Sequence, residues 1–307
     1  MLEEQYRNHL SDFNQWNQLG HASDWILFEE NMGPYLSIDE TSLSQGELYT
    51  VVANKQAKGR KGTLIALVKG TNSDFVRNIL DKIPLTKRNK VVEITLDMAS
   101  TMERIAKYTF PRAKLVTDRF HVQKLAYEAV QEVRIRHRWE AIEEENNEIE
   151  SAKKLNQKYV PEVLENGDSL KQLLARSRYL LFKPECKWTQ SQVQRANLLF
   201  AKYPDIKETY DLSMELGRIY YTTKEKGVAY TKLAKWYDKV ERSGYESFNV
   251  IAKSISEHYI NILNFFDNRS TNASAESFNA KIKAFRASFR GVTDVSFFLF
   301  RLSNVYA

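Results

Sequence analysis

Two aspartates early in the chain end apolar runs. Asp39 closes the run Tyr-Leu-Ser-Ile-Asp, and Asp97 closes the run Val-Val-Glu-Ile-Thr-Leu-Asp. An aspartate at the end of a buried strand lies at the edge of the sheet, where ligands bind in α/β folds. Two carboxylates brought together there repel each other, so a cation must bind them or one must take up a proton. Taken alone, each aspartate is better explained as a cap of the turn or helix that follows.

A third acidic residue heads one face of a predicted helix near the C-terminus. Spacings of 3, 4, 3 and 4 residues place these side chains on that face: Glu276, Asn279, Lys283, Arg286 and Arg290. An apolar stripe lies opposite: Phe278, Ile282, Phe285 and Phe289. A carboxylate that binds metal, followed by cations that bind phosphates, is what a DNA-cleaving helix needs. A plain amphipathic surface helix explains the same face.

The elements that must position these residues are predicted by short apolar runs and turn residues. Strand-length runs cover residues 35–39, 48–53, 63–68, 91–96 and 113–118. The polar stretch 54–62 is typical of a hairpin loop between the second and third strands. One helix, opened by Asn72 or Ser73 and ending before Pro84, precedes the fourth strand, and another over residues 99–108 precedes the fifth.

This order predicts an α/β fold with a mixed sheet whose faces are covered by helices. It matches the ribonuclease H-like fold. If the first and fourth strands are parallel neighbours, Asp39 and Asp97 project at the same end of the sheet. Oxygen ligands beside a phosphate substrate suit Mg²⁺ or Mn²⁺.

The rest of the chain reads as almost wholly helical. From Arg119 to about Tyr259 no β-branched run reaches strand length, and breaks fall near Pro161, Pro184, Pro204 and Gly244. The acidic stretch 140–150 is most simply a solvated helix face or a connection between helices. We predict four segments: an N-terminal helix and connector (1–34), the first part of the core (35–120), a large all-helical insertion (121–260) and the C-terminal helices of the core (261–307).

Composition sets loose bounds on function. Hydrophobic residues make up 43% of the 307 residues, and the formal net charge is +6. This mild excess permits an anionic partner such as nucleic acid without requiring one. No apolar run approaches the ~20 residues that span a bilayer. The chain begins without the basic region and apolar stretch of a secretory signal, and its single cysteine, Cys186, fits a reducing intracellular setting.

Four segments together resemble the catalytic signature of insertion-sequence DDE transposases. They are Ser37-Ile-Asp-Glu-Thr, Thr95-Leu-Asp-Met-Ala, Leu115-Val-Thr-Asp-Arg-Phe-His-Val and Thr271-Asn-Ala-Ser-Ala-Glu-Ser-Phe-Asn-Ala-Lys-Ile-Lys. The chain is most similar to the bacterial ISL3-type group, which has a long helical insertion between its second aspartate and its glutamate. Each motif is weak alone, but four in the same order on the expected elements are specific. The resemblance extends over nearly the whole chain from Tyr35.

The resemblance implies roles for several residues. Asp39, Asp97 and Glu276 become the ligands of two Mg²⁺ or Mn²⁺ ions, while His121 lies near the scissile phosphate with Asp118 beside it. An N-cap aspartate followed by a half-buried histidine explains the last two residues equally well. Residues expected to contact DNA are Asn279, Lys283, Arg286 and Arg290, with Lys281 reaching a phosphate from the side of the helix.

The implied activity is cleavage of double-stranded DNA at element ends, followed by strand transfer into a target. The resemblance further implies a homodimer that works in the bacterial cytoplasm, at the nucleoid, with no membrane partner. Full-length relatives carry an N-terminal zinc-binding segment and a helix-turn-helix. Only about 34 residues precede the first predicted strand here, and they hold no Cys/His cluster. End recognition is therefore expected from a separate polypeptide, from a missing portion or from the insertion domain.

Two other functions stay open from the sequence. One is a ribonuclease H-like nuclease that cuts DNA without joining it. The other is a non-catalytic DNA-binding protein descended from a transposase, although such a protein would not need three convergent carboxylates. Trp188 and Trp236, in the predicted insertion, fit core packing better than stacking on a DNA base.

Overall fold

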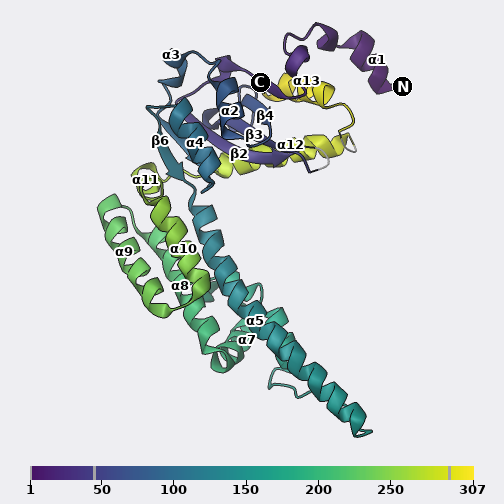
Figure 1. Cartoon of the computed structure of the whole chain (residues 1–307), viewed down its shortest axis with the longest axis vertical. Helices are drawn as coiled ribbons and strands as arrows, with labels where there is room; N and C mark the ends of the chain where they lie inside the picture. Colours follow the sequence, from purple (N-terminus) through teal and green to yellow (C-terminus); the bar gives the residue numbers. More distant parts are fainter. Residues whose placement is uncertain (1, 44–45, 290–291) are drawn as a thin grey trace. The chain divides into compact units, whose positions relative to one another are not determined.

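A computed structural model of the chain describes residues 2–43, 46–289 and 292–307. Its contacts form two compact units. The first unit joins Met1–Arg119 to His258–Ala307, and the second is Phe120–Glu257. Figure 1 shows the elements of both units in sequence colours.

The first unit is built on a mixed sheet of six strands among the described residues. Their bounds are β1 Trp25–Leu27, β2 Tyr35–Ser42, β3 Leu48–Asn54, β4 Leu64–Lys69, β5 Glu93–Leu96 and β6 Lys114–Thr117. The order across the sheet is β1-β4-β3-β2-β5-β6. Pairs β2–β3, β3–β4 and β1–β4 are antiparallel, whereas β2–β5 and β5–β6 are parallel. The predicted mixed sheet is confirmed, including the parallel contact between the strands that carry Asp39 and Asp97.

Strand β1 is the one strand that the sequence did not indicate. It is only Trp-Ile-Leu, paired antiparallel with the outer edge of β4. Three residues are too few to show an alternation of apolar and polar side chains. The remainder of residues 1–34 was predicted to be a helix and connector. Residues 2–10 form one continuous helical segment, α1 Leu2–Gln5 and η1 Tyr6–Leu10, which is followed by the short helical turns η2 Asp12–Gln15, η3 Leu19–His21 and η4 Glu29–Asn31.

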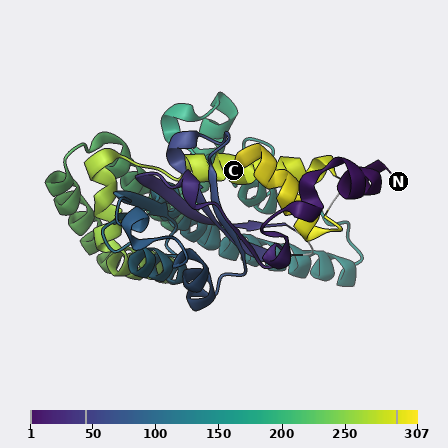
Figure 2. The ribbon, with the colours of Figure 1, turned by 90° about the horizontal axis from the view of Figure 1, so that it is seen from above.

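Helices cover both faces of the sheet, as seen from above in Figure 2. On one face, α2 (Ser73–Leu80) and α4 (Ser100–Thr109) bury Val76, Ile79 and Met102 against Leu36, Ile94 and other strand residues. On the other face, α12 (Ala273–Ser288) and α13 (Val295–Tyr306) pack on β3 and β4. Because both faces are covered, β4 is apolar along most of its length rather than alternating.

Local signals in the sequence explain where these helices begin and end. The Asn72 side chain accepts hydrogen bonds from the backbone N–H groups of Asp74 and Phe75 and so caps α2. Pro84 follows that helix, and a short helix that was not predicted, α3 (Leu85–Arg88), begins directly after it. Strand β3 continues into a turn of 3-10 helix, η5 (Lys55–Ala57). Helix α11 (Tyr259–Asn268) packs on β6, where the Asn264 side chain donates to the Leu115 carbonyl at 2.8 Å.

The regular elements of the second unit are all helices among its described residues, as the sequence predicted. Its elements are α5 Arg119–Lys154, whose first residue belongs to the first unit, then α6 Leu170–Arg176, η6 Leu180–Phe182, η7 Glu185–Lys187, α7 Gln190–Lys202, α8 Pro204–Thr222, α9 Lys226–Ser243 and α10 Glu246–Glu257. Pro204 is the first residue of α8. Gly244, at φ +72°, ends α9 in the left-handed conformation that glycine adopts without strain.

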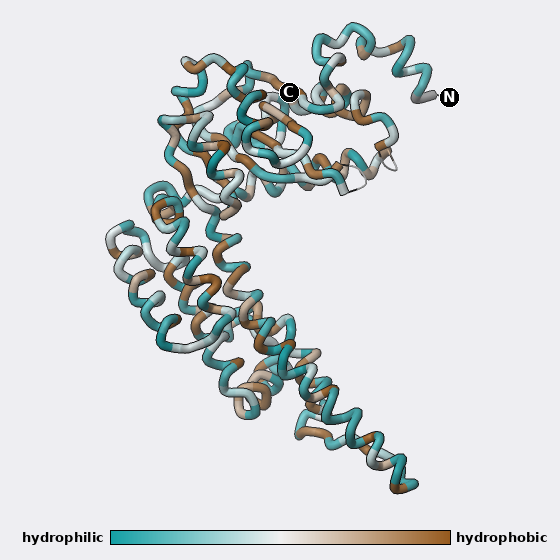
Figure 3. Tube along the Cα trace, in the orientation of Figure 1, coloured by the Kyte–Doolittle hydropathy of each residue, from teal (hydrophilic) through white to brown (hydrophobic). Residues whose placement is uncertain are grey.

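The acidic stretch 140–150 lies in the distal part of α5, where most side chains are exposed. The hydropathy colouring of Figure 3 shows this end of α5 as mostly hydrophilic. The interpretation as a solvated helix is therefore confirmed. Within the described part of the chain, no helix combines the length and the apolar character that crossing a bilayer requires.

Candidate metal site

Three aspartates lie at the same level on neighbouring parallel strands. Asp97 and Asp118 directly follow β5 and β6, whereas Asp39 lies inside β2, which continues to Ser42 instead of ending at Asp39 as predicted. Ser37 of β2 pairs with Thr95 of β5. Asp39 and Asp97 each lie two residues after this pair, so they are at the same level. Leu96 of β5 pairs with Thr117 of β6. Asp97 follows Leu96 and Asp118 follows Thr117, so these two aspartates are also at one level. The fold therefore forms a row of carboxylates along one edge of the sheet, with Asp97 in the middle.

Asp39 is oriented by two hydrogen bonds. Its Oδ1 accepts from the backbone N–H of Glu40 at 2.9 Å, and its Oδ2 accepts from Nδ2 of Asn279 at 2.8 Å. The same Asn279 nitrogen also donates to the Glu40 carbonyl at 3.2 Å. These bonds fix the direction in which the Asp39 carboxylate points.

The Asp97 side chain caps the turn that follows it, which was the alternative to a metal-binding role. Its Oδ1 accepts from the backbone N–H of Ala99 at 2.9 Å, just before α4 begins at Ser100. This bond uses one oxygen of the carboxylate. A capping role and a ligand role are therefore compatible in the same side chain.

Helix α12 is fixed against the middle of the sheet at its first turn. The Thr95 hydroxyl donates to Oδ1 of Asn272 at 3.1 Å, and Asn272 is fully buried. The backbone N–H of Glu276 in turn bonds to the Asn272 carbonyl at 3.0 Å. This contact explains why Glu276, far away in sequence, comes to the edge of the sheet where the aspartates lie.

Glu276 lies close to Asp118 within the first unit. A carboxylate oxygen of Glu276 lies within 4.8 Å of a carboxylate oxygen of Asp118. Asp118 is buried and Glu276 is exposed. His121 is half-buried in the first turn of α5 and belongs to the second unit.

The acidic charge at this edge acts on a neighbouring glutamate. Burial, and secondly the charge of Asp97, raise the pKa of the Glu40 carboxyl above its ordinary value. Carboxylates that disfavour one another's ionised form in this way attract a cation. Carboxylate oxygens are donors that suit Mg²⁺ or Mn²⁺. Oδ1 of Asn279, beside Asp39, is buried and has no hydrogen-bond partner within the described chain.

The apolar face of α12 is as predicted, while one residue of its polar face, Asn279, is buried. Phe278 and Ile282 are fully buried and Phe285 and Phe289 pack beside them, so the apolar stripe is confirmed. Asn279, expected to contact DNA, is only 7% exposed and bonds to Asp39. Helical spacing placed Asn279 on the same face as Glu276, and in the structure its side-chain amide bonds to the Asp39 carboxylate of β2.

The basic residues of α12 are placed as follows. Lys281 donates from Nζ to the Gly59 carbonyl at 2.7 Å, so its ammonium is engaged by the protein itself. Lys283 is exposed and Arg286 is half-buried. Arg290 lies outside the described residues.

Two of the three tryptophans of the helical unit, Trp188 and Trp236, are packing residues, whereas Trp139 is 66% exposed. Trp236 is fully buried and donates from Nε1 to the Leu212 carbonyl at 2.8 Å. Trp188 donates to the Leu180 carbonyl at 2.9 Å. Core packing, the interpretation that the sequence favoured, is therefore confirmed for both.

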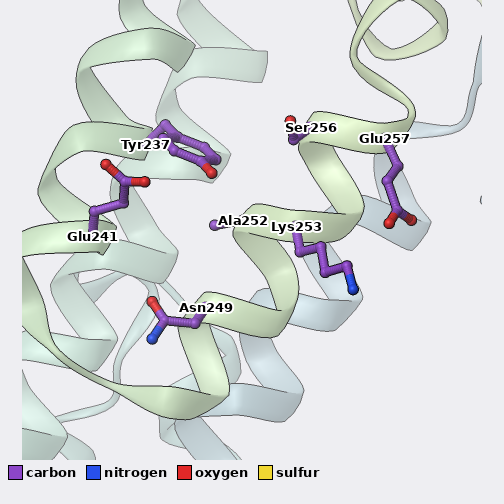
Figure 4. Close-up of a pocket in the computed structure, with 7 residues that line it drawn as sticks. All are labelled: Tyr237, Glu241, Asn249, Ala252, Lys253, Ser256 and Glu257. Atoms are coloured by element: carbon purple, nitrogen blue, oxygen red, sulfur yellow. The ribbon is translucent and has the colours of Figure 1, made fainter.

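A hollow in the helical unit offers no comparable chemistry. It lies between α9 and α10, where Tyr237 and Glu241 face Ala252 and its neighbours (Figure 4). Its other lining residues are Asn249, Lys253, Ser256 and Glu257. Charges of both signs and an open shape are what an ordinary groove between two solvated helices presents.

The strand order, the row of aspartates and the glutamate on a returning helix define a ribonuclease H-like protein with an acidic site. A family model described as a transposase, of the ISL3-type DDE group, matches residues 36–302. The chain therefore belongs to the ISL3-type DDE transposases, which makes it an enzyme of DNA transposition. Searches of curated proteins and of solved structures returned no match.

Proposed function

We propose that this chain cuts and joins DNA at the carboxylate edge of its sheet, with two Mg²⁺ or Mn²⁺ ions held by Asp39, Asp97 and Glu276. The observation that carries the proposal is the register of β2 and β5, which brings Asp39 and Asp97 to one level. Asp118, next in the row and close to Glu276, is a further ligand of the same site. The carboxylates fit hard divalent cations.

When bound, such a pair of ions activates an attacking oxygen and stabilises the leaving oxygen of a phosphodiester. The chain's own residues supply the rest. Asn279 holds Asp39 in one orientation through its bond to Oδ2. An imidazole nitrogen of His121 takes the proton of the attacking hydroxyl as a general base. Since two DNA ends must be joined, the proposal includes a homodimer.

The test combines metal binding with DNA cleavage. We expect Asp39→Asn, Asp97→Asn and Glu276→Gln each to lower the cleavage rate at least 100-fold while duplex affinity is kept. The substrate is a labelled duplex taken from the segments that border the coding region, and its cleavage is measured with Mg²⁺. Mn²⁺ binding is measured separately by calorimetry. Asp118→Asn tests the fourth acid, and Asp81→Asn, an exposed acid after α2, is the matched control.

The possible outcomes separate the candidate functions. Nicking that survives in all three variants contradicts the ligand assignment. Cleavage by the wild-type chain without any joined product favours a nuclease. A wild-type chain that binds DNA but neither binds Mn²⁺ nor cleaves is a DNA-binding protein without catalysis.

A further inference from the structure

The loop between β3 and β4 concentrates positive charge. Its residues 55–62 contain Lys55, Lys58, Arg60 and Lys61 and no acidic residue. The side chains of Lys58, Arg60 and Lys61 are exposed. None of these three has an ion-pair partner among the residues that the structure describes. The sequence had indicated only a hairpin loop here.

Contacts made by two lysine side chains hold this loop in place. Lys281 of α12 donates to the Gly59 carbonyl at 2.7 Å, and Lys55 points inward to the buried Glu93 at 3.9 Å. Gly59 has φ +70°, and a Cβ added there would lie 2.7 Å from Nζ of Lys281. The Thr63 hydroxyl closes the far side by donating to the Arg60 carbonyl at 2.6 Å. The exposed cations are therefore carried by a loop that is anchored on both sides.

The loop lies close to the candidate metal site. Lys281 and Glu276 are on the same helix, five residues apart, which corresponds to about 7.5 Å along its axis. Burial lowers the pKa of Lys55, while the charges of Glu93 and Asp118 act to raise it. Asp118 thus lies within electrostatic reach of the loop.

We propose that Lys58, Arg60 and Lys61 bind backbone phosphates of the duplex DNA beside the cleavage site, and that Lys281 positions the loop rather than contacting DNA. The inference rests on the proposed function, because it takes duplex DNA as the substrate at this edge. A DNA strand presents one phosphate per ~3.4 Å of helix axis, so the loop reaches phosphates within a few nucleotides of the cut. Cations on an anchored loop bind with less loss of conformational freedom. Such contacts set the register of the duplex without reading its sequence.

The first experiment compares two triple variants of equal charge. The loop variant is Lys58→Asn, Arg60→Gln, Lys61→Gln, where asparagine tolerates the positive φ of Lys58. The control is Lys90→Gln, Lys107→Gln, Arg112→Gln, which removes three exposed cations elsewhere in the first unit. Duplex affinity is measured by fluorescence anisotropy over a range of salt concentrations, without metal. Melting temperatures check that both variants fold.

We expect the loop variant to lose at least tenfold in affinity at 0.1 M salt. Its slope of log K against log salt should become shallower by about two to three, since each phosphate contact contributes about 0.9. The control should stay within twofold of the wild-type chain. Equal affinity in the two variants, or a wild-type chain whose duplex binding does not respond to salt, overturns the proposal.

Lys281→Met tests the positioning role. We expect faster hydrogen exchange in residues 55–62 together with a partial loss of affinity. A shallower salt slope with unchanged exchange would instead make Lys281 a direct phosphate contact and contradict its assigned role.

These readouts are independent of catalysis. If the loop variant binds like the control while the carboxylate variants abolish cleavage, the surface is wrong and the proposed function stands. If the carboxylate variants still cleave while the loop variant binds weakly, the metal ligands are wrong and the surface stands.

Discussion

At the scale of single residues, Asn279 shows how one side chain links two distant parts of the sequence. It sits one turn after Glu276 on α12 and donates to Asp39 on β2 at 2.8 Å. A residue that orients a metal ligand affects metal affinity without touching the metal. In the proposed mechanism, Asn279 is therefore a positioning residue.

Replacing Asn279 tests that role. We expect Asn279→Ala to raise the Mn²⁺ concentration for half-maximal cleavage by roughly 10–100-fold, the usual effect of removing such a partner. Asn279→Asp should be worse, because it puts a second carboxylate against Asp39. Both effects are measured as metal titrations of cleavage, with duplex affinity as the reference. Wild-type metal dependence in Asn279→Ala would assign the residue to packing alone.

At the scale of elements, the helical unit is held by one buried acid as well as by its apolar core. Asp168 precedes α6, is 1% exposed and binds both Arg176 and Arg195, the latter at 3.1 Å. Burial acts to raise the pKa of its carboxyl, but the hydrogen bonds and charges of the two arginines outweigh burial and leave that pKa below its ordinary value. A carboxyl with a lowered pKa stabilises the fold when it is ionised.

Asp168→Asn should therefore destabilise the protein at neutral pH by about 1.5–3 kcal/mol, the range for hydrogen bonds to charged groups. The stabilising effect is fully present above the ordinary aspartate pKa of about 3.9 and is lost as the pH falls through the lower pKa of the folded state. Urea unfolding followed at pH 7 and at pH 3 measures both values. A difference between variant and wild type that does not shrink at acid pH would contradict this assignment.

At the scale of the whole molecule, the division into two units has a direct consequence. The second unit buries its own residues, among them Leu173, Leu199, Leu216, Leu233 and Trp236. It is also continuous in sequence, from Phe120 to Glu257. A continuous segment with a core of its own is expected to fold alone.

We expect a fragment of residues 120–257 to be helical and to unfold in one cooperative transition. Circular dichroism during heating measures this, and a fragment carrying Trp236→Ala should melt at a lower temperature because the largest core side chain is lost. A gradual loss of helicity without a transition would show that this segment depends on the first unit for its fold.

Much of the architecture was predictable from short-range patterns. Apolar runs and turn residues located β2 to β6, because strands covered on both faces are continuously apolar. Asn72, Pro204 and Gly244 located helix ends, because capping and backbone restrictions are local properties. The three-residue β1 and the N-terminal turns were missed, since such short pieces are specified by what they pack against. Phe13, for instance, packs on Phe297, with ring centroids 5.1 Å apart.

By itself, the sequence determined which side chains are available for chemistry and on which elements they lie: Asp39 on one strand, Asp97 at the end of another, Glu276 on an amphipathic helix, and a long helical insertion. Only the tertiary structure decided which of them meet. The register of β2, β5 and β6 put Asp118 in the row with Asp97, and the fixed start of α12 brought Glu276 to Asp118. It also turned Asn279 toward Asp39 and Lys281 toward the basic loop. Strand pairing and helix docking join residues far apart in sequence, and no local spacing encodes such contacts.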